Sequence, residues 1–444
     1  MAAAHAKNET TLHVQANAVV TPSARDAAAA CGMEIVREPC SGRTAPAADA
    51  HPADLDLARE VKRRVLASLP PEKHNDPLID QLVTEALKKA TSPLLAPLAA
   101  PMSAPDVYAA CRAACLNTPK RIVFPDALDP RVLRAAADLH KKRLARPVLL
   151  GNPPDLHTAA AQNGLALEGC RLVDHTAPDL LQQNAADILA AFNRGGRELT
   201  RDEALHLARS PLFAGALMVH RGEADLGIGG NLSTTADVIR AGLRAIGLAD
   251  DTKTVFGLFF MLSPSHGTIQ VYADCAVIPE PTGSQLADIA IGSAQTLARL
   301  TGETPRVALL SFSTKGSADH PTVARIRQAL AEIKERQPDL TVDGELQFDA
   351  ATDSEAARLK APGSPVAGKV NVFVFPDLEA GNIAYKVAQR LGGYDALGPF
   401  LVGFAKGWHD LSRGCSTGDI VKTSIIGSAL ARGSSPAALP AMHI

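Results

Sequence analysis

The hydrophobic pattern of this 444-residue chain changes near residue 106. Beyond that point, short β-branched apolar runs alternate with stretches in which apolar residues recur every three or four positions. This alternation predicts an α/β fold with a mostly parallel sheet and helices on both faces. Strands are expected at 121–124, 147–150, 224–228, 307–311, 370–375 and 400–404, and helices at 131–142, 285–300, 322–335, 382–391 and 419–431. Two strand-like runs around residues 263–267 predict a hairpin within 252–279.

Residues 1–105 carry only short patterned segments separated by Ala, Pro and Ser, so they predict a small N-terminal appendage. A strand is expected at 11–20, and one helix is expected after residue 77. Another helix is expected to begin near Asp54, with one apolar stripe formed by Leu57, Val61, Val65 and Leu69. The four prolines of residues 91–105 predict a semi-rigid linker.

Composition and charge exclude several classes of protein. The hydrophobic content of 46% is enough for a full core, and the net charge of −2 gives no basic field for nucleic acid or an anionic membrane. The longest apolar run, around 255–262, is too short to span a bilayer, and the N-terminus does not resemble a signal peptide. The seven cysteines form no C-x-x-C pair, so we expect no metal site, free thiols and a cytoplasmic location.

The first of three polar loops, residues 229–237, follows a predicted strand and opens a helix that contains Arg240. Its backbone N–H groups and the side chains of Asn231, Ser233 and Thr234 could hold a phosphate at the positive end of that helix. Thr234 and Asp237 also have the spacing of an ordinary capping box. For this loop alone, the capping interpretation is favoured.

The second loop, residues 311–321, reads SFSTKGSADHP after an apolar run. Its hydroxyls and its lysine suit the oxygens of a phosphate or an acyl phosphate, with the candidates Ser313, Thr314, Lys315, Gly316 and Ser317. A polar turn without a ligand is an equal alternative. Neither loop has a Walker A or dinucleotide-binding sequence, which disfavours ATP and NAD as ligands.

The third loop, residues 410–419, reads DLSRGCSTGD. Arg413 could neutralise a phosphate or a developing oxyanion, and the carboxylate of Asp419 could accept a proton from a thiol. Ser416 and Asp419 also have capping-box spacing, so Asp419 could be purely structural. Cys415 could be a nucleophile that needs a histidine base to activate it. A packing role is favoured, because the sequence offers no candidate for that base except His409, whose position relative to Cys415 the sequence does not give.

Together, these loops resemble the phosphate acetyltransferase and phosphate butyryltransferase family over about residues 107–432. The resemblance is carried by RIVFPD at 121–126, GEAD at 222–225, DGELQFDA at 343–350, the second loop and residues 410–416. Within the family, three stretches are most similar to the ethanolamine-utilisation phosphotransacetylase: FPDALD at 124–129, GNLS at 230–233 and LEAGNI at 378–383.

The resemblance implies a two-domain α/β fold similar to isocitrate and isopropylmalate dehydrogenases, with mostly parallel sheets and the substrate in the cleft between the domains. Domain one would comprise residues 106–248 and 399–444, and domain two, residues 249–398, would be inserted into it. The resemblance also implies a homodimer.

The implied reaction is acetyl transfer between coenzyme A and phosphate, with acetyl phosphate as the other substrate. By resemblance, Asp419 takes the proton of the coenzyme A thiol, Ser412 hydrogen-bonds in the same cluster, and Arg413 binds the phosphoryl group and steadies the carbonyl oxygen. Arg240 and Arg194 correspond to arginines that bind coenzyme A. The thiolate attacks acetyl phosphate directly, so no metal, cofactor or covalent acyl-enzyme is required, and coenzyme A is a substrate.

The ethanolamine-type resemblance implies a place inside a bacterial microcompartment. The predicted helix near Asp54 could then dock on a shell protein or a partner enzyme. A dimer-swapped arm, or a helix packed on its own core, is an equal alternative. The sequence departs from housekeeping members at 229–232 and 407–409, which leaves the acyl-chain preference open.

Three other functions are weighed against acetyl transfer. Transfer of propionyl or butyryl groups stays open. A non-catalytic acetyl-CoA-sensing domain, similar to the C-terminal region of some malic enzymes, is disfavoured because Ser412, Arg413 and Asp419 are retained. A dehydrogenase is disfavoured because a shared fold alone is weak evidence for a shared function, and because the sequence has no nucleotide-binding motif.

Overall fold

The computed structural model describes residues 11–15, 34–38, 104–194, 198–250, 252–263 and 267–431. The chain divides into two compact units, Met1–Ala96 and Pro97–Ile444. In the first unit, β1 (Thr11–Gln15) pairs in parallel with β2 (Glu34–Glu38), with Thr11 opposite Glu34. The strand expected at 11–20 is therefore present over Thr11–Gln15, and residues 16–20 lie outside the described residues. The helices expected near Asp54 and after residue 77 also lie outside the described residues.

The smaller sheet of the second unit has five parallel strands in the order β13-β6-β3-β4-β5. Their bounds are β3 Lys120–Phe124, β4 Ala145–Leu150, β5 Arg171–Val173, β6 Leu226–Gly229 and β13 Gly407–Asp410. Successive side chains of β3 point to opposite faces, so Ile122 and Phe124 join one core cluster while Val123 joins another. Both faces of this sheet are thus buried under helices.

Four helices pack on each face of this smaller sheet. The Ile122 face is covered by α5 (Ala104–Asn117), α6 (Pro130–Lys141), α7 (Pro153–Gln162) and α17 (Thr417–Leu430). The Val123 face is covered by α8 (Pro178–Arg194), α9 (Arg201–Ala208), α10 (Pro211–His220) and α11 (Thr235–Ala245).

The larger sheet has the order β10-β9-β11-β8-β7-β12. Its strands are β7 Phe256–Leu262, β8 Ile269–Ala273, β9 Val307–Leu310, β10 Val342–Leu346, β11 Val372–Val374 and β12 Asp395–Val402. The strands β8 to β11 are parallel, whereas β7 runs antiparallel to both of its neighbours. The expected hairpin is therefore confirmed as β7 and β8.

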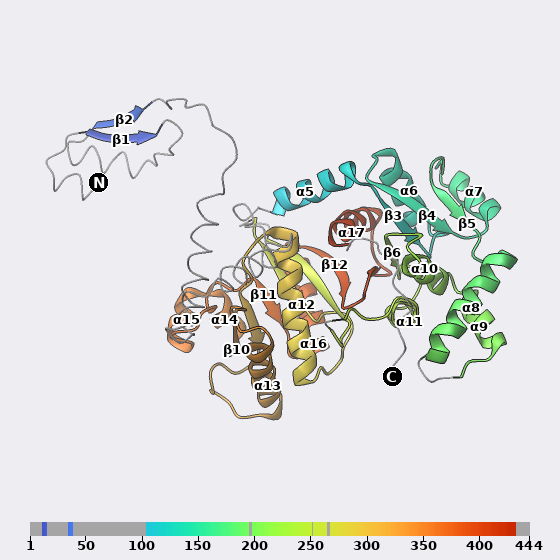
Figure 1. Ribbon diagram of the computed structural model, residues 1–444. Coiled ribbons are helices and arrows are strands. Elements are labelled where there is room, and N and C mark those ends of the chain that lie inside the picture. The colour runs from blue at the N-terminus through green and yellow to red at the C-terminus, as the bar shows by residue number, and fades with distance from the viewer. Residues whose placement is uncertain are drawn as a thin grey trace, which may run out of the picture. The chain divides into compact units, whose positions relative to one another are not determined.

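Helices also cover both faces of the larger sheet. One face packs against α12 (Gly283–Thr301) and α13 (Pro321–Arg336). The other packs against α14 (Phe348–Thr352) and α16 (Leu378–Arg390), with α15 (Ser354–Lys360) beside α14. Figure 1 shows β3 to β6 of the smaller sheet in the cyan and green part of the chain, and the larger sheet in the yellow to red-orange part.

The expected α/β class with mostly parallel sheets is confirmed. The chain leaves the smaller sheet after β6, builds the whole larger sheet, and returns at β13 (Figure 1). The strand β12 belongs to the larger sheet, although its last four residues fall within the segment 399–444 that the resemblance implies for domain one. The exact domain bounds stay a prediction.

Some elements were not expected from the sequence. The strands β5, β10 and β13 are short or carry polar residues, which hides their pattern. The helix α5 begins at Ala104, inside the segment expected as a linker. Pro105 is compatible with this start because the first N–H groups of a helix have no intrahelical partner.

Trp408 of β13 fixes the pairing of β13 with β6. Its side chain is fully buried, and its indole Nε1 donates to the carbonyl of Val238 on α11 at 2.9 Å. The indole also lies against Gly227 of β6, where a Cβ atom would come within 2.3 Å of the ring. The close approach of these two strands therefore requires a glycine at position 227.

Among the described residues, no helix is both long enough and apolar enough to span a membrane.

Candidate active site

The first and third polar loops meet at one edge of the smaller sheet. The strands β6 and β13 are adjacent and parallel, with Asp410 opposite Gly229, and β3 lies on the other side of β6. The carboxyl ends of adjacent parallel strands lie at the same edge of a sheet, which is where ligands of open α/β sheets bind. The loops that follow β3, β6 and β13 are therefore neighbours.

Two aspartates after β3 hold the first loop. The buried carboxylate of Asp126 accepts hydrogen bonds from the N–H groups of Gly230 at 2.9 Å and Leu232 at 3.3 Å, and from the hydroxyl of Ser233 at 2.9 Å. Asp129 accepts a hydrogen bond from the amide of Asn231 at 3.0 Å. Asn231 and Ser233 are thus engaged in shaping the loop.

Gly230 and Thr234 complete this loop. Gly230 has a φ of +102°, and a Cβ atom there would lie 2.0 Å from Oδ1 of Asp410, so only glycine fits. The hydroxyl of Thr234 accepts a hydrogen bond from the N–H of Asp237 at 3.2 Å and caps α11. Thr234 therefore caps α11, as the capping interpretation of this loop predicts.

Arg131, at the start of α6, joins three loops with one guanidinium. Its Nη1 donates to the carbonyl oxygens of Arg413 and Cys415, both at 2.8 Å. Its Nη2 donates to Asp129 at 2.6 Å and to the carbonyl of Asn231 at 3.3 Å. Arg131 thus ties the backbone of the third loop to the first loop and to the end of β3. Its position in the sequence gives no sign of this role.

The predicted catalytic residues Ser412, Arg413 and Asp419 lie on this third loop and the first turn of α17. The side chains of Ser412 and Arg413 are exposed. Asp419 and Ser416 form a capping box, in which Oδ2 of Asp419 accepts from the N–H and the hydroxyl of Ser416, both at 2.9 Å. In the described part of the chain, Oδ1 of Asp419 has no hydrogen-bond partner and remains available.

Cys415 and His409 do not form a nucleophile and base pair. Cys415 is buried, and this burial raises the pKa of its thiol to about 11, so the thiol is protonated at neutral pH. His409 is buried on β13 and packs edge-on against Phe400. Burial lowers the pKa of His409 to about 4, so its ring is neutral. These positions favour the packing role expected for Cys415.

Asp410, the last residue of β13, is a buried acid beneath the site. Its Oδ2 accepts a hydrogen bond from the hydroxyl of Thr235 at 2.6 Å. Burial raises the pKa of Asp410 to about 6, although the hydrogen bond from Thr235 acts to lower it. The nearby charge of Asp126 adds to the increase. Asp410 therefore connects the third loop to the start of α11.

The second loop follows β9 and belongs to the larger sheet. Ser313 is buried, and its hydroxyl donates to Glu345 of β10 at 3.2 Å. The hydroxyl of Thr314 accepts from the N–H of Gln347 at 2.9 Å, and the hydroxyl of Ser317 accepts from the N–H of Thr314 at 3.0 Å.

The same loop is anchored by two carboxylates of β10. Lys315 forms an ion pair with Asp343, and the N–H of Gly316 donates to Glu345 at 2.7 Å. Burial alone would raise the pKa of Glu345, but hydrogen bonds from Arg327 and Gly316 lower this pKa to about 2. Among the described residues, no hydrogen bond or ion pair joins this loop to Ser412 or Arg413.

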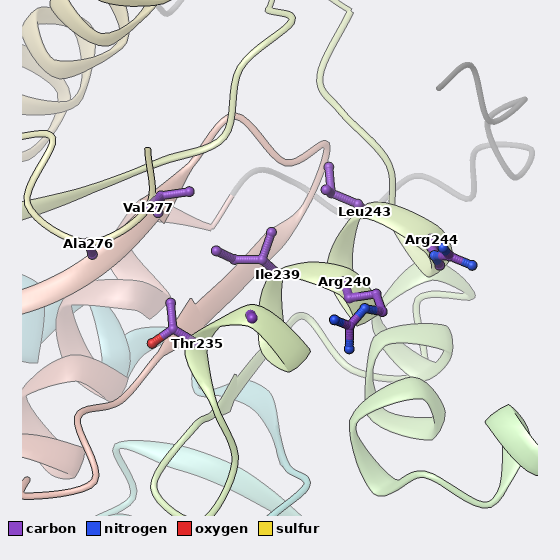
Figure 2. A pocket seen from close by; sticks show the side chains of 8 residues that line it. Thr235, Ile239, Arg240, Leu243, Arg244, Ala276 and Val277 are labelled. Carbon is purple, nitrogen blue, oxygen red and sulfur yellow. The ribbon is translucent and has the colours of Figure 1, made fainter. Parts of the chain in front are cut away.

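A groove of about 530 Å³ lies between α11 and the turn after β8. Figure 2 shows Arg240 and Arg244 extending from α11, while Ala276 and Val277 line the other wall. The remaining lining residues are Thr235, Ala236, Ile239 and Leu243. Because α11 packs on the smaller sheet and Ala276 follows a strand of the larger one, the groove runs between the two sheets.

Arg240 also borders a second cavity of about 310 Å³, lined by residues of α9, α10 and α11. Its guanidinium pairs with Asp237 at 2.5 Å, and about half of the Arg240 side chain is exposed. Arg194 is the last residue of α8, and its side chain lies outside the described residues. The structure therefore places Arg240 in the groove and does not test Arg194.

The described residues contain no group of three or more histidine, cysteine, aspartate or glutamate side chains that could hold a metal ion. Each of the five cysteines in this part of the chain is free: Cys111, Cys115, Cys170, Cys275 and Cys415.

Comparison with known proteins assigns this chain to a class. The chain matches the family model described as phosphate acetyl/butaryl transferase over residues 107–428, so it belongs to this family and is an acyltransferase. It is 44% identical over 312 residues to the phosphate acetyltransferase of Paracoccus denitrificans, covering 69% of this chain and 93% of that relative.

Two solved structures share the fold. A phosphotransacetylase from Streptococcus pyogenes has a TM-score of 0.70 and 38% identity, covering 74% of this chain and 99% of that one. The EutD phosphotransacetylase from Staphylococcus aureus has a TM-score of 0.66 and 35% identity with the same coverage. The expected resemblance to this family is confirmed.

Proposed function

We propose that the protein transfers an acetyl group reversibly between coenzyme A and phosphate, so that acetyl-CoA and phosphate give coenzyme A and acetyl phosphate. The observation that carries this proposal is the exposed pair Ser412 and Arg413, in a chain of this family. The pair lies on a loop whose backbone Arg131 binds at the carbonyls of Arg413 and Cys415. The relative from Paracoccus denitrificans is named a phosphate acetyltransferase, which favours acetyl over longer acyl groups.

The proposed reaction is a direct displacement. In one direction, Asp419 takes the proton of the coenzyme A thiol, and the thiolate forms a C–S bond with the carbonyl carbon of acetyl phosphate. The C–O bond to the phosphate then breaks, and the leaving phosphate takes the proton back from Asp419. A free thiol has a pKa of roughly 8.5, so a base raises the nucleophilic fraction at neutral pH.

Asp419 is suited to this proton transfer by its two oxygens. Its Oδ2 is fixed by the capping box, which holds the carboxylate at the start of α17. Its Oδ1 would then receive the thiol proton. The structural and the catalytic interpretation of Asp419 are therefore compatible.

Arg413 would neutralise the leaving phosphate and the oxyanion that forms on the carbonyl oxygen, while Ser412 would donate a hydrogen bond to the same group. The hydroxyl of Ser412 accepts a hydrogen bond from the N–H of Gly414 at 3.3 Å, which leaves its proton for a substrate oxygen. Preorganised donors of this kind typically contribute about 3 to 4 kcal/mol to a transition state.

Coenzyme A would bind in the groove of α11, with Arg240 and Arg194 on its phosphates. Arg240 must then exchange Asp237 for a phosphate, and this costs little because exposed ion pairs contribute about 0 to 1 kcal/mol. The apolar side chains of Ile239, Leu243 and Val277 suit the uncharged part of the coenzyme.

The phosphate-binding role of the second loop also stays a proposal, for Ser313, Thr314, Lys315, Gly316 and Ser317. Their hydrogen bonds run to β10 and to one another, so binding phosphate would require an exchange of partners. The side chain of Lys315 is 39% exposed and could reach a ligand if it released Asp343.

No cofactor or metal is required by this proposal, because the substrates supply the nucleophile and the leaving group. A direct test is release of phosphate from acetyl phosphate that depends on coenzyme A, measured without NAD or added metal and repeated with propionyl and butyryl phosphate. Faster release from the longer acyl phosphates would favour propionyl or butyryl transfer. Binding of coenzyme A without any release would instead favour the sensing domain.

The cellular setting is a further part of the proposal. We propose a cytoplasmic homodimer that acts in ethanolamine or related aldehyde catabolism inside a microcompartment, supported by the likeness to the EutD phosphotransacetylase. Residues 1–105, all of which precede the family match, would bind a shell protein or a partner enzyme. If deletion of residues 1–105 left co-purification with shell proteins unchanged, this role of the appendage would be wrong.

A further inference from the structure

The turn after β8, residues 274–278, is held by one buried carboxylate. Asp274 is 2% exposed. Its Oδ1 accepts hydrogen bonds from the N–H groups of Gly257 at 3.0 Å, Ala276 at 2.9 Å and Val277 at 3.2 Å, and its Oδ2 accepts from the N–H of Ile278 at 2.7 Å. Burial raises the pKa of Asp274, and these four hydrogen bonds act to lower it. One side chain therefore binds three successive N–H groups of the turn and one of the neighbouring strand β7.

Gly257 of β7 lies directly against this turn. Its N–H donates to Asp274, and its carbonyl accepts a hydrogen bond from the N–H of Cys275 at 3.0 Å. A Cβ atom at position 257 would lie 2.6 Å from the Cβ of Ala276, which is closer than two carbon atoms can pack. Its distance to Cγ2 of Val277 would be 3.5 Å, an ordinary contact. The strand β7 therefore sets the position of Ala276 through one close approach that requires a glycine.

Ala276 and Val277 form one wall of the groove that α11 borders. Figure 2 shows this wall opposite Ile239 and Leu243 of α11. Val277 also packs against the core cluster on the Val123 face of the smaller sheet, and Ile239 packs against the same cluster. The position of the turn therefore sets the width of the groove between the two sheets.

We propose that Asp274 is a positioning residue for coenzyme A, which acts by holding Ala276 and Val277 at the distance from α11 that the coenzyme requires. This inference rests on the coenzyme A site proposed above and adds to it a buried group that does not touch the ligand. The wall contacts the coenzyme equally in the ground state and in the transition state. Displacing the wall therefore raises the KM for coenzyme A and leaves kcat nearly unchanged, whereas a merely structural carboxylate would affect stability alone.

Asp274→Asn tests the carboxylate. The variant keeps one oxygen for the N–H groups at Oδ1 and turns an NH2 group towards the N–H of Ile278, so the turn must shift. We expect the KM for coenzyme A to rise about three- to tenfold, with the KM for acetyl phosphate and kcat within about twofold of the wild-type values. The matched control is Asp288→Asn on α12, because Asp288 is also buried, accepts a hydrogen bond from Thr254 and does not line the groove. We expect this control to lower the Tm without changing either KM.

Gly257→Ala displaces the same wall without changing Asp274, and it keeps the proposal testable if Asp274→Asn does not fold. The new Cβ would push Ala276 away from β7, and we expect the KM for coenzyme A to rise about tenfold. Adding Ala276→Gly removes the atom that this Cβ meets, so the double variant should return the KM to within about threefold of the wild-type value. The control is Gly292→Ala on α12, where a Cβ would lie 3.0 Å from the ring of Phe256, away from the groove.

Steady-state kinetics of the full chain, with each substrate varied in turn, measures the KM values, and isothermal titration calorimetry measures the Kd of coenzyme A for each folded variant. Three results would overturn the proposal: an unchanged KM and Kd for coenzyme A in folded Asp274→Asn or Gly257→Ala, equal increases in both KM values, or a double variant no better than Gly257→Ala. A wild-type chain that binds coenzyme A but releases no phosphate would refute the proposed reaction instead. The Kd values would then still decide whether Asp274 positions the wall.

Discussion

Arg131 illustrates how single residues position this site without being part of the predicted chemistry. Its guanidinium holds two carbonyls of the third loop at 2.8 Å each and a carbonyl of the first loop at 3.3 Å. The backbone on both sides of Gly414 is thus fixed by a residue more than 280 positions away in the chain. Removing Arg131 leaves these acceptors without their donor and frees the loop.

We therefore expect Arg131→Met to lower kcat by about 10- to 100-fold, because misplacement of a catalytic group by about 1 Å can cost that much. The KM for coenzyme A should change little, since Arg131 does not line the groove. Arg134→Met on the exposed side of the same helix is the control. Added guanidinium ion should partly restore turnover of Arg131→Met, whereas a variant that had merely lost stability would not respond.

Asp410 gives a prediction for the dependence of stability on pH. Burial raises its pKa to about 6, above the value of about 3.9 in an unfolded chain, so the folded state holds the proton more tightly. Stability from this group is therefore complete below about pH 4 and is lost as the pH rises through 6. The carboxylate form costs up to about 3 kcal/mol at neutral pH.

Asp410→Asn removes this titration and keeps an oxygen for the hydroxyl of Thr235. We expect the Tm of the variant, relative to the wild-type Tm, to be higher at pH 7.5 than at pH 4.5. Thermal unfolding at both values measures this difference. A relative Tm that is the same at both values would show that Asp410 does not titrate between them.

Which site residues could be predicted depends on how far their roles are local. Ser412, Arg413 and Asp419 share one short segment and its resemblance to a family, so the sequence names them. The roles of Asp126, Arg131 and Asp410 depend on contacts between loops more than 100 residues apart. No spacing along the chain shows such contacts.

At the scale of elements, the pair β6 and β13 determines where the first and third loops lie. The indole of Trp408 fills the space that a side chain at Gly227 would need, and its Nε1 bonds to α11. These contacts set the distance between the two strands and the helix that borders the groove.

Gly227→Ala is expected to destabilise the protein by about 1 to 3 kcal/mol, the usual cost of overpacking a core. Urea unfolding measures this change. The matched control is Gly418→Ala in the first turn of α17, where a Cβ atom would meet only an ordinary contact at 3.5 Å. Equal stability of the two variants would contradict the role given to Trp408.

Elements with strong patterns were predictable, and elements shaped by long-range contacts were not. The apolar run of β9 predicts a buried strand, and the structure places it in the larger sheet. Its neighbour β10 reads VDGEL, and its polar residues hide the pattern of a buried strand. Asp343 and Glu345 can be buried there because they form ion pairs with Lys315 and Arg327. The polar strand is explained by partners that the local sequence does not contain.

At the scale of the whole molecule, the groove between α11 and the turn after β8 runs between the two sheets and is connected to the third loop through Thr235. Thr235 lines the groove and donates its hydroxyl proton to Asp410, two residues before Ser412. A coenzyme that lies along α11 would thus be directed towards the predicted catalytic residues.

Arg240→Ala should therefore raise the KM for coenzyme A about tenfold or more and leave the KM for acetyl phosphate nearly unchanged, because only one substrate loses a charged contact. Steady-state kinetics with each substrate varied in turn measures this split. Lys142→Ala, which breaks an exposed ion pair on α6, should leave both KM values as they are. Equal increases in both KM values would argue against a coenzyme site at Arg240.

The central claim is acetyl transfer at Ser412, Arg413 and Asp419. Its most direct test is the rate at which purified full-length protein releases phosphate from acetyl phosphate in the presence and absence of coenzyme A, compared with Arg413→Ala. We expect rapid release that requires coenzyme A in the wild-type protein, and a kcat about 100- to 1,000-fold lower in the variant. Wild-type protein that binds coenzyme A without releasing phosphate, or a variant with near-normal turnover, would contradict the claim.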